Sequence, residues 1–98
     1  MFSGQSSALD DAARRRRILF RAWHRGTREM DLILGRFANA EIKNLSESDL
    51  DDFERLLEAA DPDLFAWITG EAVPPAMHHT PVFRKILAFY GLAAPFDS

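Results

Sequence analysis

Hydrophobic residues recur along this chain three and four positions apart, which is the spacing of one face of an α-helix. The pattern predicts five helices, at about residues 10–23, 28–40, 47–60, 62–69 and 81–90. No segment reads as an alternating strand flanked by turns. Because 98 residues are enough for one core but too few for two, we expect an all-α, single-domain, five-helix bundle over residues 10–92, between flexible ends at 1–9 and 93–98.

Residues that favour helix starts stand just before four of these segments. Thr27, Ser46, Asp61 and Thr80 can each accept a hydrogen bond from a backbone N–H of the first turn. Ser46 is followed three positions later by Asp49, which resembles a capping box with a shorter acid. Proline directly follows Asp61 and Thr80, at the first helical position, where its missing N–H removes no helical bond. These signals predict where the helices begin.

Each predicted helix has an apolar face that should contribute to the core. The residues predicted to face inward are Ile18, Leu19, Phe20, Ala22 and Trp23; Met30, Ile33, Leu34, Phe37 and Ala38; Leu50, Phe53, Leu56, Leu57 and Ala60; Leu64, Phe65, Trp67 and Ile68; and Val82, Phe83, Ile86, Leu87 and Tyr90. The opposite face of the first helix is basic and carries Arg14, Arg17, Arg21, His24 and Arg25. Acids of the third helix, including Asp49, are expected mostly to face water. Trp67 fits the core or a partner surface.

The composition is that of a soluble globular protein, with 47% hydrophobic residues, 28% charged residues and no cysteine. No apolar run approaches the roughly 20 residues that cross a bilayer, so we expect no stable membrane insertion. Asp10 and Asp11 oppose a secretory signal and a transit peptide, although the run Arg14–Arg17 resembles part of the latter. We therefore expect a cytoplasmic location, as in a bacterium, and retain the mitochondrial matrix as the less favoured alternative.

Charge is distributed unevenly along the chain. Residues 14–36 contain eight arginines and two acids, whereas residues 41–71 contain ten acids and two basic residues. A molecule with one basic and one acidic side is oriented by its charges when it meets a partner protein, and the acidic side weakens its attraction to DNA. The tight turn between two helices imitates a helix-turn-helix, but the second helix carries Glu29 and Asp31. We expect no nucleic-acid partner, and keep nucleic-acid binding or an adaptor role through the Arg-rich first helix as the alternative function.

No arrangement of side chains indicates an enzyme or a metal site. His24 lies beside arginines, which disfavour its protonation. His78 and His79 are adjacent in the Pro-containing linker 71–79 and lack a ligand three or four positions away, so surface or capping roles are expected. The glycines form no phosphate-binding fingerprint. We predict no catalytic residue, no metal and no cofactor of the protein's own.

The junction of the first two helices, Arg25-Gly26-Thr27-Arg28-Glu29, is the candidate site. Gly26 has no side chain and lets another backbone come close. The guanidinium groups of Arg25 and Arg28 can make directional bonds to carboxylates or carbonyls. If the chain were helical here, Arg25 could pair with Glu29, and Arg28 with Asp31. On the residues alone, a surface charge cluster and a partner-docking corner both fit, and the first is the simpler.

This junction is similar to the R-G-x-x-E motif of the succinate dehydrogenase FAD assembly factor family, the SdhE type. The resemblance spans roughly residues 17–90 and has further parts in the same order. These are Gly35-Arg36-Phe37-Ala38 in the second helix, Leu45-Ser46 at the start of the third, Asp61-Pro62-Asp63-Leu64-Phe65-Ala66-Trp67 in the fourth, and the Pro-containing linker. The order, the spacing and the chain length make the resemblance specific.

The resemblance implies a five-helix bundle that binds the flavoprotein subunit of succinate dehydrogenase, and in some bacteria that of fumarate reductase. It implies a helper that promotes covalent attachment of FAD to a histidine of that subunit by positioning, without being an enzyme itself. The partner-binding residues that it implies are Arg25, Gly26, Arg28, Glu29 and Asp31. The chain differs from many relatives at His24 and Thr27, where they often carry a basic residue and Met.

Overall fold

The computed structural model describes residues 3–96, which contain five α-helices, one short 3₁₀ helix and the turns that connect them. The elements are α1 (Ser3–Trp23), α2 (Arg28–Glu41), α3 (Glu47–Leu56), α4 (Asp61–Thr69), η1 (Ala76–His78) and α5 (Pro81–Phe89). There is no strand within these residues. The predicted all-α fold class is therefore confirmed.

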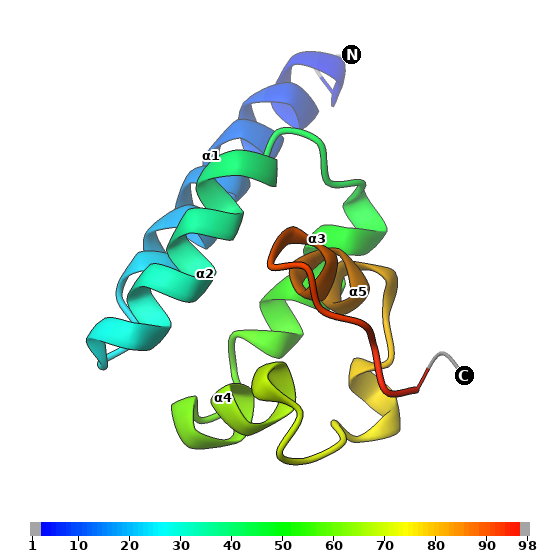
Figure 1. Ribbon diagram of the computed structural model, residues 1–98. Helices are drawn as coiled ribbons and strands as arrows, with labels where there is room; N and C mark the ends of the chain where they lie inside the picture. Colours follow the sequence, from blue (N-terminus) through cyan, green and yellow to red (C-terminus); the bar gives the residue numbers. More distant parts are fainter. Residues whose placement is uncertain (1–2, 97–98) are drawn as a thin grey trace.

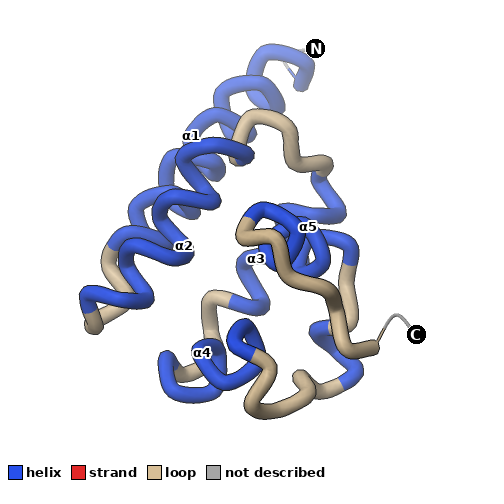
Figure 2. Tube along the Cα trace, in the orientation of Figure 1, coloured by secondary structure: helices blue, strands red, loops and turns tan. Residues whose placement is uncertain are grey.

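Helices α1 and α2 form a long antiparallel hairpin on one side of the molecule (Figure 1). Helix α5 contacts both α3 and α2, so that the second half of the chain is joined to the hairpin through α5. Helix α4 lies near the end of the hairpin where α1 turns into α2, as the tube view also shows (Figure 2). The α1–α2 turn and the start of α4 are thus close in space although far apart in sequence.

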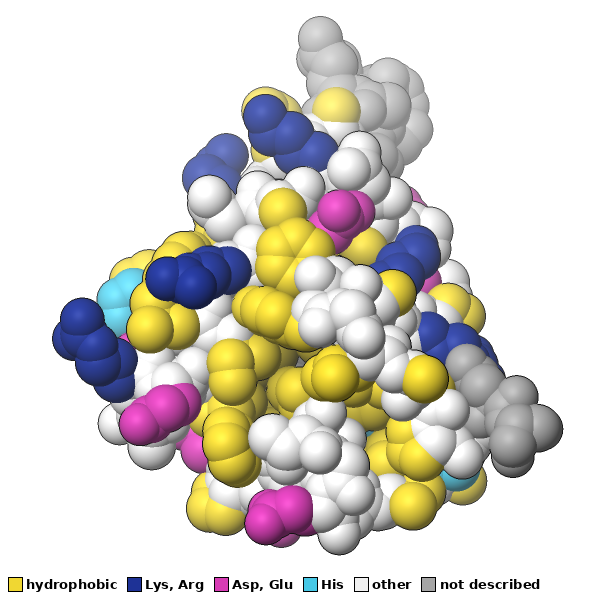
Figure 3. All heavy atoms as spheres, in the orientation of Figure 1, with side chains coloured by type: hydrophobic (Ala, Val, Ile, Leu, Met, Phe, Trp, Pro, Cys, Tyr) yellow, Lys and Arg dark blue, Asp and Glu magenta, His cyan; other side chains and the backbone are white. Residues whose placement is uncertain are grey.

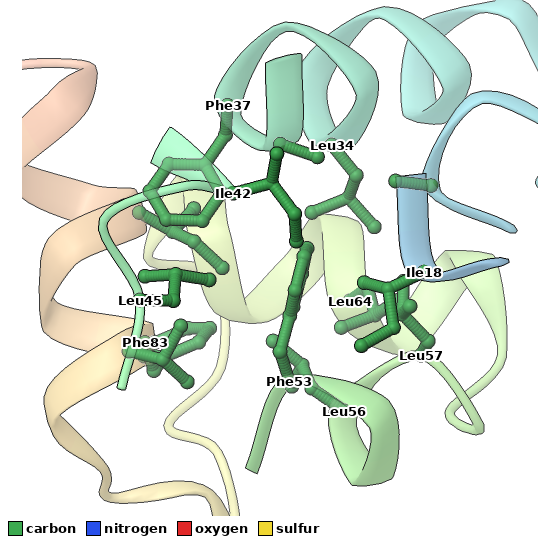
Figure 4. Close-up of a cluster of buried hydrophobic side chains, with 14 of the residues drawn as sticks. Ile18, Leu34, Phe37, Ile42, Leu45, Phe53, Leu56, Leu57, Leu64 and Phe83 are labelled. Atoms are coloured by element: carbon green, nitrogen blue, oxygen red, sulfur yellow. The ribbon is translucent and has the colours of Figure 1, made fainter. Parts of the chain in front are cut away.

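One hydrophobic core joins all five α-helices. Ile18, Leu34, Phe53, Leu64 and Phe83 come one from each α-helix in chain order, and all five are fully buried. Their side chains point into the same cluster (Figure 4). Burial of each large apolar side chain stabilises the fold by about 2 kcal/mol. Since every helix contributes to this cluster, no single helix is dispensable for the packing of the others.

The hairpin is tight because Gly35 of α2 is covered by Trp23 of α1. A Cβ atom added at Gly35 would lie 2.6 Å from Cε2 of Trp23, and closer still to two other atoms of the indole ring. A glycine inside a helix costs about 1 kcal/mol relative to alanine. Here the missing side chain leaves the room in which the indole ring packs directly on the backbone of α2.

Most of the predicted helix starts are confirmed. The Thr27 hydroxyl accepts a hydrogen bond from the Met30 N–H at 3.3 Å, and the Thr80 hydroxyl accepts one at 3.2 Å from the first turn of α5. Ser46 and Asp49 form the predicted capping box, with reciprocal bonds of 3.0 and 3.3 Å. These interactions join residues three positions apart, so the local sequence is sufficient to determine them.

Three predicted boundaries are wrong. Helix α1 begins at Ser3 instead of near Asp10, because an existing helix extends through small polar residues when no proline interrupts it. Helix α3 ends at Leu56 and not near Ala60, because the chain tightens into bonds between residues three apart. Ala60 is consequently the N-cap of α4, and Asp61, the predicted cap, is its first helical residue and bonds elsewhere.

Three residues predicted to face inward are exposed. Phe20 is 62% exposed, because it lies two positions from the buried Ile18 and hence about 200° away around the helix. Ala60 lies outside α3 in the connection to α4. Phe65 is 40% exposed, since Leu64 occupies the inward position next to it. The predicted apolar arcs were therefore wider than the surface that neighbouring helices cover.

Asp49 does not face water as predicted. Its side chain is 7% exposed and accepts a hydrogen bond of 2.7 Å from Lys85 Nζ on α5, in addition to the capping bond from the Ser46 N–H. Burial alone would raise the pKa of Asp49, but the hydrogen bonds from Lys85 and Ser46 outweigh it and lower that pKa. Asp49 thus links the start of α3 to α5.

Part of the predicted flexible C-terminal end lies against the core. Ala94 and Phe96 pack on it, and the Phe96 ring stacks on His79 with 4.1 Å between the ring centroids. The remainder of the two predicted flexible ends includes residues 1–2 and 97–98, which lie outside the described residues. Within residues 3–96, no helix has both the length and the apolar character needed to cross a membrane.

Candidate functional site

The candidate junction forms a sharp turn between α1 and α2. Trp23 is the last residue of α1 and Arg28 is the first of α2. Gly26 has a backbone φ of 120°, a conformation that residues with a side chain rarely adopt. The turn lies at the free end of the hairpin, at the lower left of Figure 1. It places a side-chain-free position at a corner of the molecule.

Arg25 fastens this turn to the start of α4. Its Nε atom donates to Asp61 Oδ1 at 2.9 Å, its Nη2 atom donates to the Ala59 carbonyl at 2.5 Å, and its Nη1 atom donates to the Leu57 carbonyl. The Arg25 side chain is 11% exposed and that of Asp61 is 13% exposed. The guanidinium is therefore bonded to the α3–α4 connection and to the first residue of α4. It does not lie on the outer face of α1, contrary to the prediction.

Asp31 and Thr27 fix the remainder of the turn. The Asp31 carboxylate accepts a hydrogen bond from the Arg25 N–H and a longer one, at 3.4 Å, from the Gly26 N–H. The Thr27 hydroxyl donates to Asp61 Oδ2 at 3.3 Å. A carboxylate that satisfies backbone N–H groups at a helix start also matches the helix dipole. Asp31 consequently acts on the backbone of the turn.

The outer residues of the turn face solvent. Gly26, Thr27, Arg28 and Glu29 are all exposed. The ion pairs considered for a helical junction, Arg25 with Glu29 and Arg28 with Asp31, are absent among residues 3–96. The turn at Gly26 interrupts the helix between Arg25 and Glu29, and the Asp31 carboxylate bonds the backbone N–H groups of Arg25 and Gly26 instead of Arg28. The five predicted site residues therefore divide into anchored ones, Arg25 and Asp31, and presented ones, Gly26, Arg28 and Glu29.

A hollow of about 310 Å³ opens beside the presented residues, and its lining residues are Thr27, Glu29, Met30, Asp61, Pro62 and Phe65. Half of this wall comes from α4, and the other half comes from the first turn of α2 together with its N-cap, Thr27. Hydrophobic side chains lie next to acidic ones on this part of the surface, at the lower left of Figure 3. A half-exposed aromatic ring beside an exposed carboxylate suits a partner side chain that has an apolar stem and a polar or basic end.

Asp61 and Phe65 belong to this site although the sequence pattern did not indicate them. Asp61 carried a signal, an acid at a helix start, but that signal indicates capping and not an ion pair across 36 residues. Phe65 fell on a predicted apolar arc, and periodicity alone does not separate a core ring from a surface ring. The charge asymmetry was the remaining clue, because it favours contacts between the basic first helix and the acidic second half.

The histidines occupy structural positions. His24 stacks on Phe20, with 3.9 Å between ring centroids, and His79 Nε2 donates to the Pro74 carbonyl at 2.7 Å. His78 is buried against Trp67, so the predicted surface role is wrong. The pKa of His78 is lowered, mainly by burial and secondly by the positive charge of Arg55. Trp67 is partly buried and packs on the core. No three potential metal ligands gather anywhere in residues 3–96.

Comparison with known proteins gives consistent matches. The family model described as flavinator of succinate dehydrogenase matches residues 16–90. The FAD assembly factor SdhE of Acetobacter pasteurianus is 40% identical over 87 residues, which are 87% of this chain and 80% of that protein. The mitochondrial succinate dehydrogenase assembly factor 2 of Dictyostelium discoideum is 40% identical over 72 residues.

The share of each relative that is matched differs widely. This chain spans 51% of the Dictyostelium discoideum protein and 25% of the mitochondrial succinate dehydrogenase assembly factor 2 of Mycosarcoma maydis, to which it is 45% identical over 60 residues. It spans four fifths of the Acetobacter pasteurianus protein, and the family model covers most of the chain. This chain therefore belongs to the family of flavinators of succinate dehydrogenase.

Proposed function

We propose that this protein is an assembly factor that binds the flavoprotein subunit of succinate dehydrogenase and promotes covalent attachment of FAD to that subunit. The family to which the chain belongs and the name of its Acetobacter pasteurianus relative support this function. The structural observation that carries it is the exposure of Gly26, Arg28 and Glu29 at one corner of the molecule, in a turn that Arg25 bonds to α4.

The corner suits docking because its shape is held by bonds that lie behind it. Arg25 and Asp61 are largely buried and join the turn to α4, so the exposed backbone at Gly26 does not have to be ordered when a partner binds. A surface that is ordered before binding loses less conformational entropy on association. In this proposal Arg25 and Asp31 act through the turn that they hold, whereas Gly26, Arg28 and Glu29 contact the client.

The protein acts on the flavoprotein by positioning and is not itself an enzyme. Holding the reacting parts of a client in a productive geometry accelerates a reaction without supplying a reacting group. In the proposed mechanism, contact at the corner holds the domains or loops around the client's FAD site while the client forms its own bond to the flavin. The side chains presented at the corner are a guanidinium and a carboxylate, which suit binding better than nucleophilic attack.

We further propose that the protein carries no FAD of its own. The hollow beside the corner has acidic residues in its wall, Glu29 and Asp61, and carboxylates repel the pyrophosphate group of FAD. The protein without its client should leave FAD fluorescence unchanged across a titration. A saturable change in that fluorescence would contradict this part of the proposal.

Two substitutions test the corner directly. In Gly26→Arg a long side chain occupies the position where a partner backbone would approach, and in Glu29→Ala the presented carboxylate is removed. Each variant should remain folded by circular dichroism and should lower stimulated flavin attachment at least about tenfold, as is typical of a central contact. Attachment is measured as flavin fluorescence of the denatured flavoprotein band.

Matched controls separate docking from strain and from loss of charge. Gly91 also has positive φ, 72°, and an added Cβ there meets no atom within 4 Å outside the adjoining residues, so Gly91→Arg places an arginine at a positive-φ glycine elsewhere. Glu47 is exposed like Glu29 and lies beside Asp10 and Asp11, so Glu47→Ala removes an acid away from the corner. Both controls should stimulate flavin attachment as the wild type does. Normal stimulation by Gly26→Arg and Glu29→Ala would refute the proposed role of the corner.

The client range and the location complete the proposal. The flavoprotein subunit of fumarate reductase is a second client to be tested in the same assay. We place the protein in the cytoplasm, as expected from its similarity to a relative from a bacterium, although other relatives are named as mitochondrial proteins. Fractionation of cells, followed by detection of the protein with an antibody, tests this location.

A further inference from the structure

One side of α1 carries an exposed aromatic ring among arginines. We call this surface the outer α1 face, and its residues are Arg16, Arg17, Phe20, Arg21 and His24. These positions fall on one side of the helix, opposite the buried Ile18 and Ala22. Phe20 is 62% exposed and its ring is supported by the stacked ring of His24. The ring is therefore presented outward with a defined orientation.

Shallow hollows lie on either side of Phe20. One, of about 470 Å³, is lined by Ala13, Arg16, Arg17, Phe20 and Arg21. The other, of about 360 Å³, is lined by Arg16, Leu19, Phe20, Trp23 and His24. Each combines apolar surface with at least one guanidinium group. Such a surface accepts an aliphatic side chain next to the ring while the rim binds carboxylates.

The arginines of α1 differ sharply in how they are used within the molecule. Arg14 bonds Asp51 at 2.5 Å and Glu54 at 2.7 Å, both on α3. Arg15 bonds Asp11 at 2.8 Å and donates to two backbone carbonyls of the α2–α3 connection. Arg16, Arg17 and Arg21, by contrast, form no ion pair or hydrogen bond within the described part of the chain. The internal packing accounts for Arg14 and Arg15 but not for the other three.

Charge complementarity identifies the kind of partner that suits this face. Three unpaired guanidinium groups attract a surface rich in carboxylates, and planar guanidinium groups bind carboxylates with two parallel bonds. A membrane suits the face less well, because Phe20 is surrounded by arginines and the other exposed large apolar residue of α1, Leu9, lies about three turns away, whereas an interfacial helix needs a broad, continuous apolar side. Duplex DNA would meet the ten acids of residues 41–71 on the same small molecule.

We propose that the outer α1 face is a second contact surface, which binds an acidic segment of the client flavoprotein with an aliphatic side chain seated against Phe20. This inference rests on the proposed function, because it assigns the face to the same client as the corner at Gly26. His24 immediately precedes Arg25, so the two surfaces are continuous along the end of α1. The client would then be held along α1 as well as at the turn.

Binding of the purified flavoprotein subunit to the full-length protein tests the proposal. Arg16→Glu/Arg17→Glu should weaken binding about tenfold at about 0.05 M salt, and the difference should shrink at about 0.5 M salt, where exposed charges are screened. Phe20→Ser should weaken binding about tenfold at both salt concentrations, because an apolar contact is not screened. Calorimetric titration measures both effects, and circular dichroism confirms that each variant is folded.

A double charge reversal on another face is the matched control. Arg36 and Lys43 are both exposed. Arg36 lies near Tyr90, whose pKa is raised by burial against the opposing charge of Arg36, and this places Arg36 on the α5 side of α2. Arg36→Glu/Lys43→Glu should bind within about twofold of the wild type, since scattered surface charges contribute little.

The outcomes separate this inference from the proposed function. If the wild type does not bind the flavoprotein at all, the proposed function fails and this inference fails with it. If Glu29→Ala loses binding while Arg16→Glu/Arg17→Glu and Phe20→Ser bind like the wild type, the second surface alone is refuted. The second surface is also refuted, and the proposed function is not, if the α1 variants lose binding to duplex DNA or to anionic phospholipid vesicles while their binding of the flavoprotein is unchanged.

Discussion

Arg25 and Arg28 lie three positions apart in the same turn and have opposite surroundings. The Arg25 guanidinium is almost buried, pairs with Asp61 and donates to two backbone carbonyls. Arg28 is exposed at the first position of α2, and no ion pair involves it within residues 3–96. One arginine holds the corner together, and the other is available to a partner.

This difference shows that two residues of the same type in one short motif can have different roles, one in the structure of the turn and one at its surface. Substitution of either arginine could reduce activity, but for different reasons: loss of the corner's shape in one case and loss of a contact in the other. Stability and activity must therefore be measured together on each variant. The expected change in stability is largest for Arg25→Ala, smaller for Lys85→Met and smallest for Arg28→Ala.

Arg25→Ala should destabilise the protein by about 3 kcal/mol, because it leaves the buried Asp61 carboxylate without its cation and two carbonyls without their donor. Urea unfolding followed by circular dichroism measures the change. Arg25→Lys keeps the charge but cannot reproduce the planar set of three bonds, so its loss should be intermediate. If Arg25→Ala unfolds at the same urea concentration as the wild type, Arg25 does not anchor the corner.

Lys85→Met probes an ion pair of intermediate exposure. Lys85 is 46% exposed while its partner Asp49 is buried, so the loss should be about 1 kcal/mol near neutral pH, less than for Arg25. Lys43→Met, at an exposed lysine without a bonded partner in the described part of the chain, is the control and should change little. Thermal unfolding of the three proteins measures the order.

The pH dependence of the same variant gives a sign test. The folded state lowers the pKa of Asp49, so the stabilisation that this implies is fully present above the unfolded value of about 4 and is lost as the pH falls through the folded value. The difference in stability between wild type and Lys85→Met should therefore be constant at neutral pH and should disappear in acid. A difference that grows in acid would contradict this assignment.

Arg28→Ala should leave stability almost unchanged and slightly raised, by about 0.3 kcal/mol, because a cation at the start of a helix opposes the helix dipole. Flavin attachment to the client should nevertheless fall several-fold if Arg28 contacts it. The thermal midpoint and the flavin fluorescence of the client band measure the two quantities on one preparation. A stability loss as large as that of Arg25→Ala would remove the distinction between the two arginines.

The sequence predicted those features of the fold that depend on neighbouring residues. Thr27, Ser46 and Thr80 cap their helices as expected, because each bond joins residues three apart. The end of α3 could not be placed in the same way. It is determined in part by Arg25, whose donors reach the carbonyls of the α3–α4 connection from 32 to 34 positions away.

The candidate site was predicted in position but not in internal organisation. Arg25, Gly26, Arg28, Glu29 and Asp31 do lie at one turn, since they are close in sequence. Helical periodicity assigned Arg25 to the outward stripe of α1, because it takes no account of a turn at Gly26 that redirects the side chain. The contribution of α4 to the hollow was also not foreseen, as it requires the tertiary structure.

The bond between Arg25 and Asp61 joins residues 36 positions apart, more than a third of the chain, and closes a loop that contains α2 and α3. Contacts between distant residues form after local helices, because the entropy of loop closure must first be overcome. During synthesis the corner therefore cannot take its final shape until α4 has been made and has docked. If the corner is the client-binding surface, as proposed, a nascent or partly folded copy of the protein lacks that surface, and only completed molecules compete for the client.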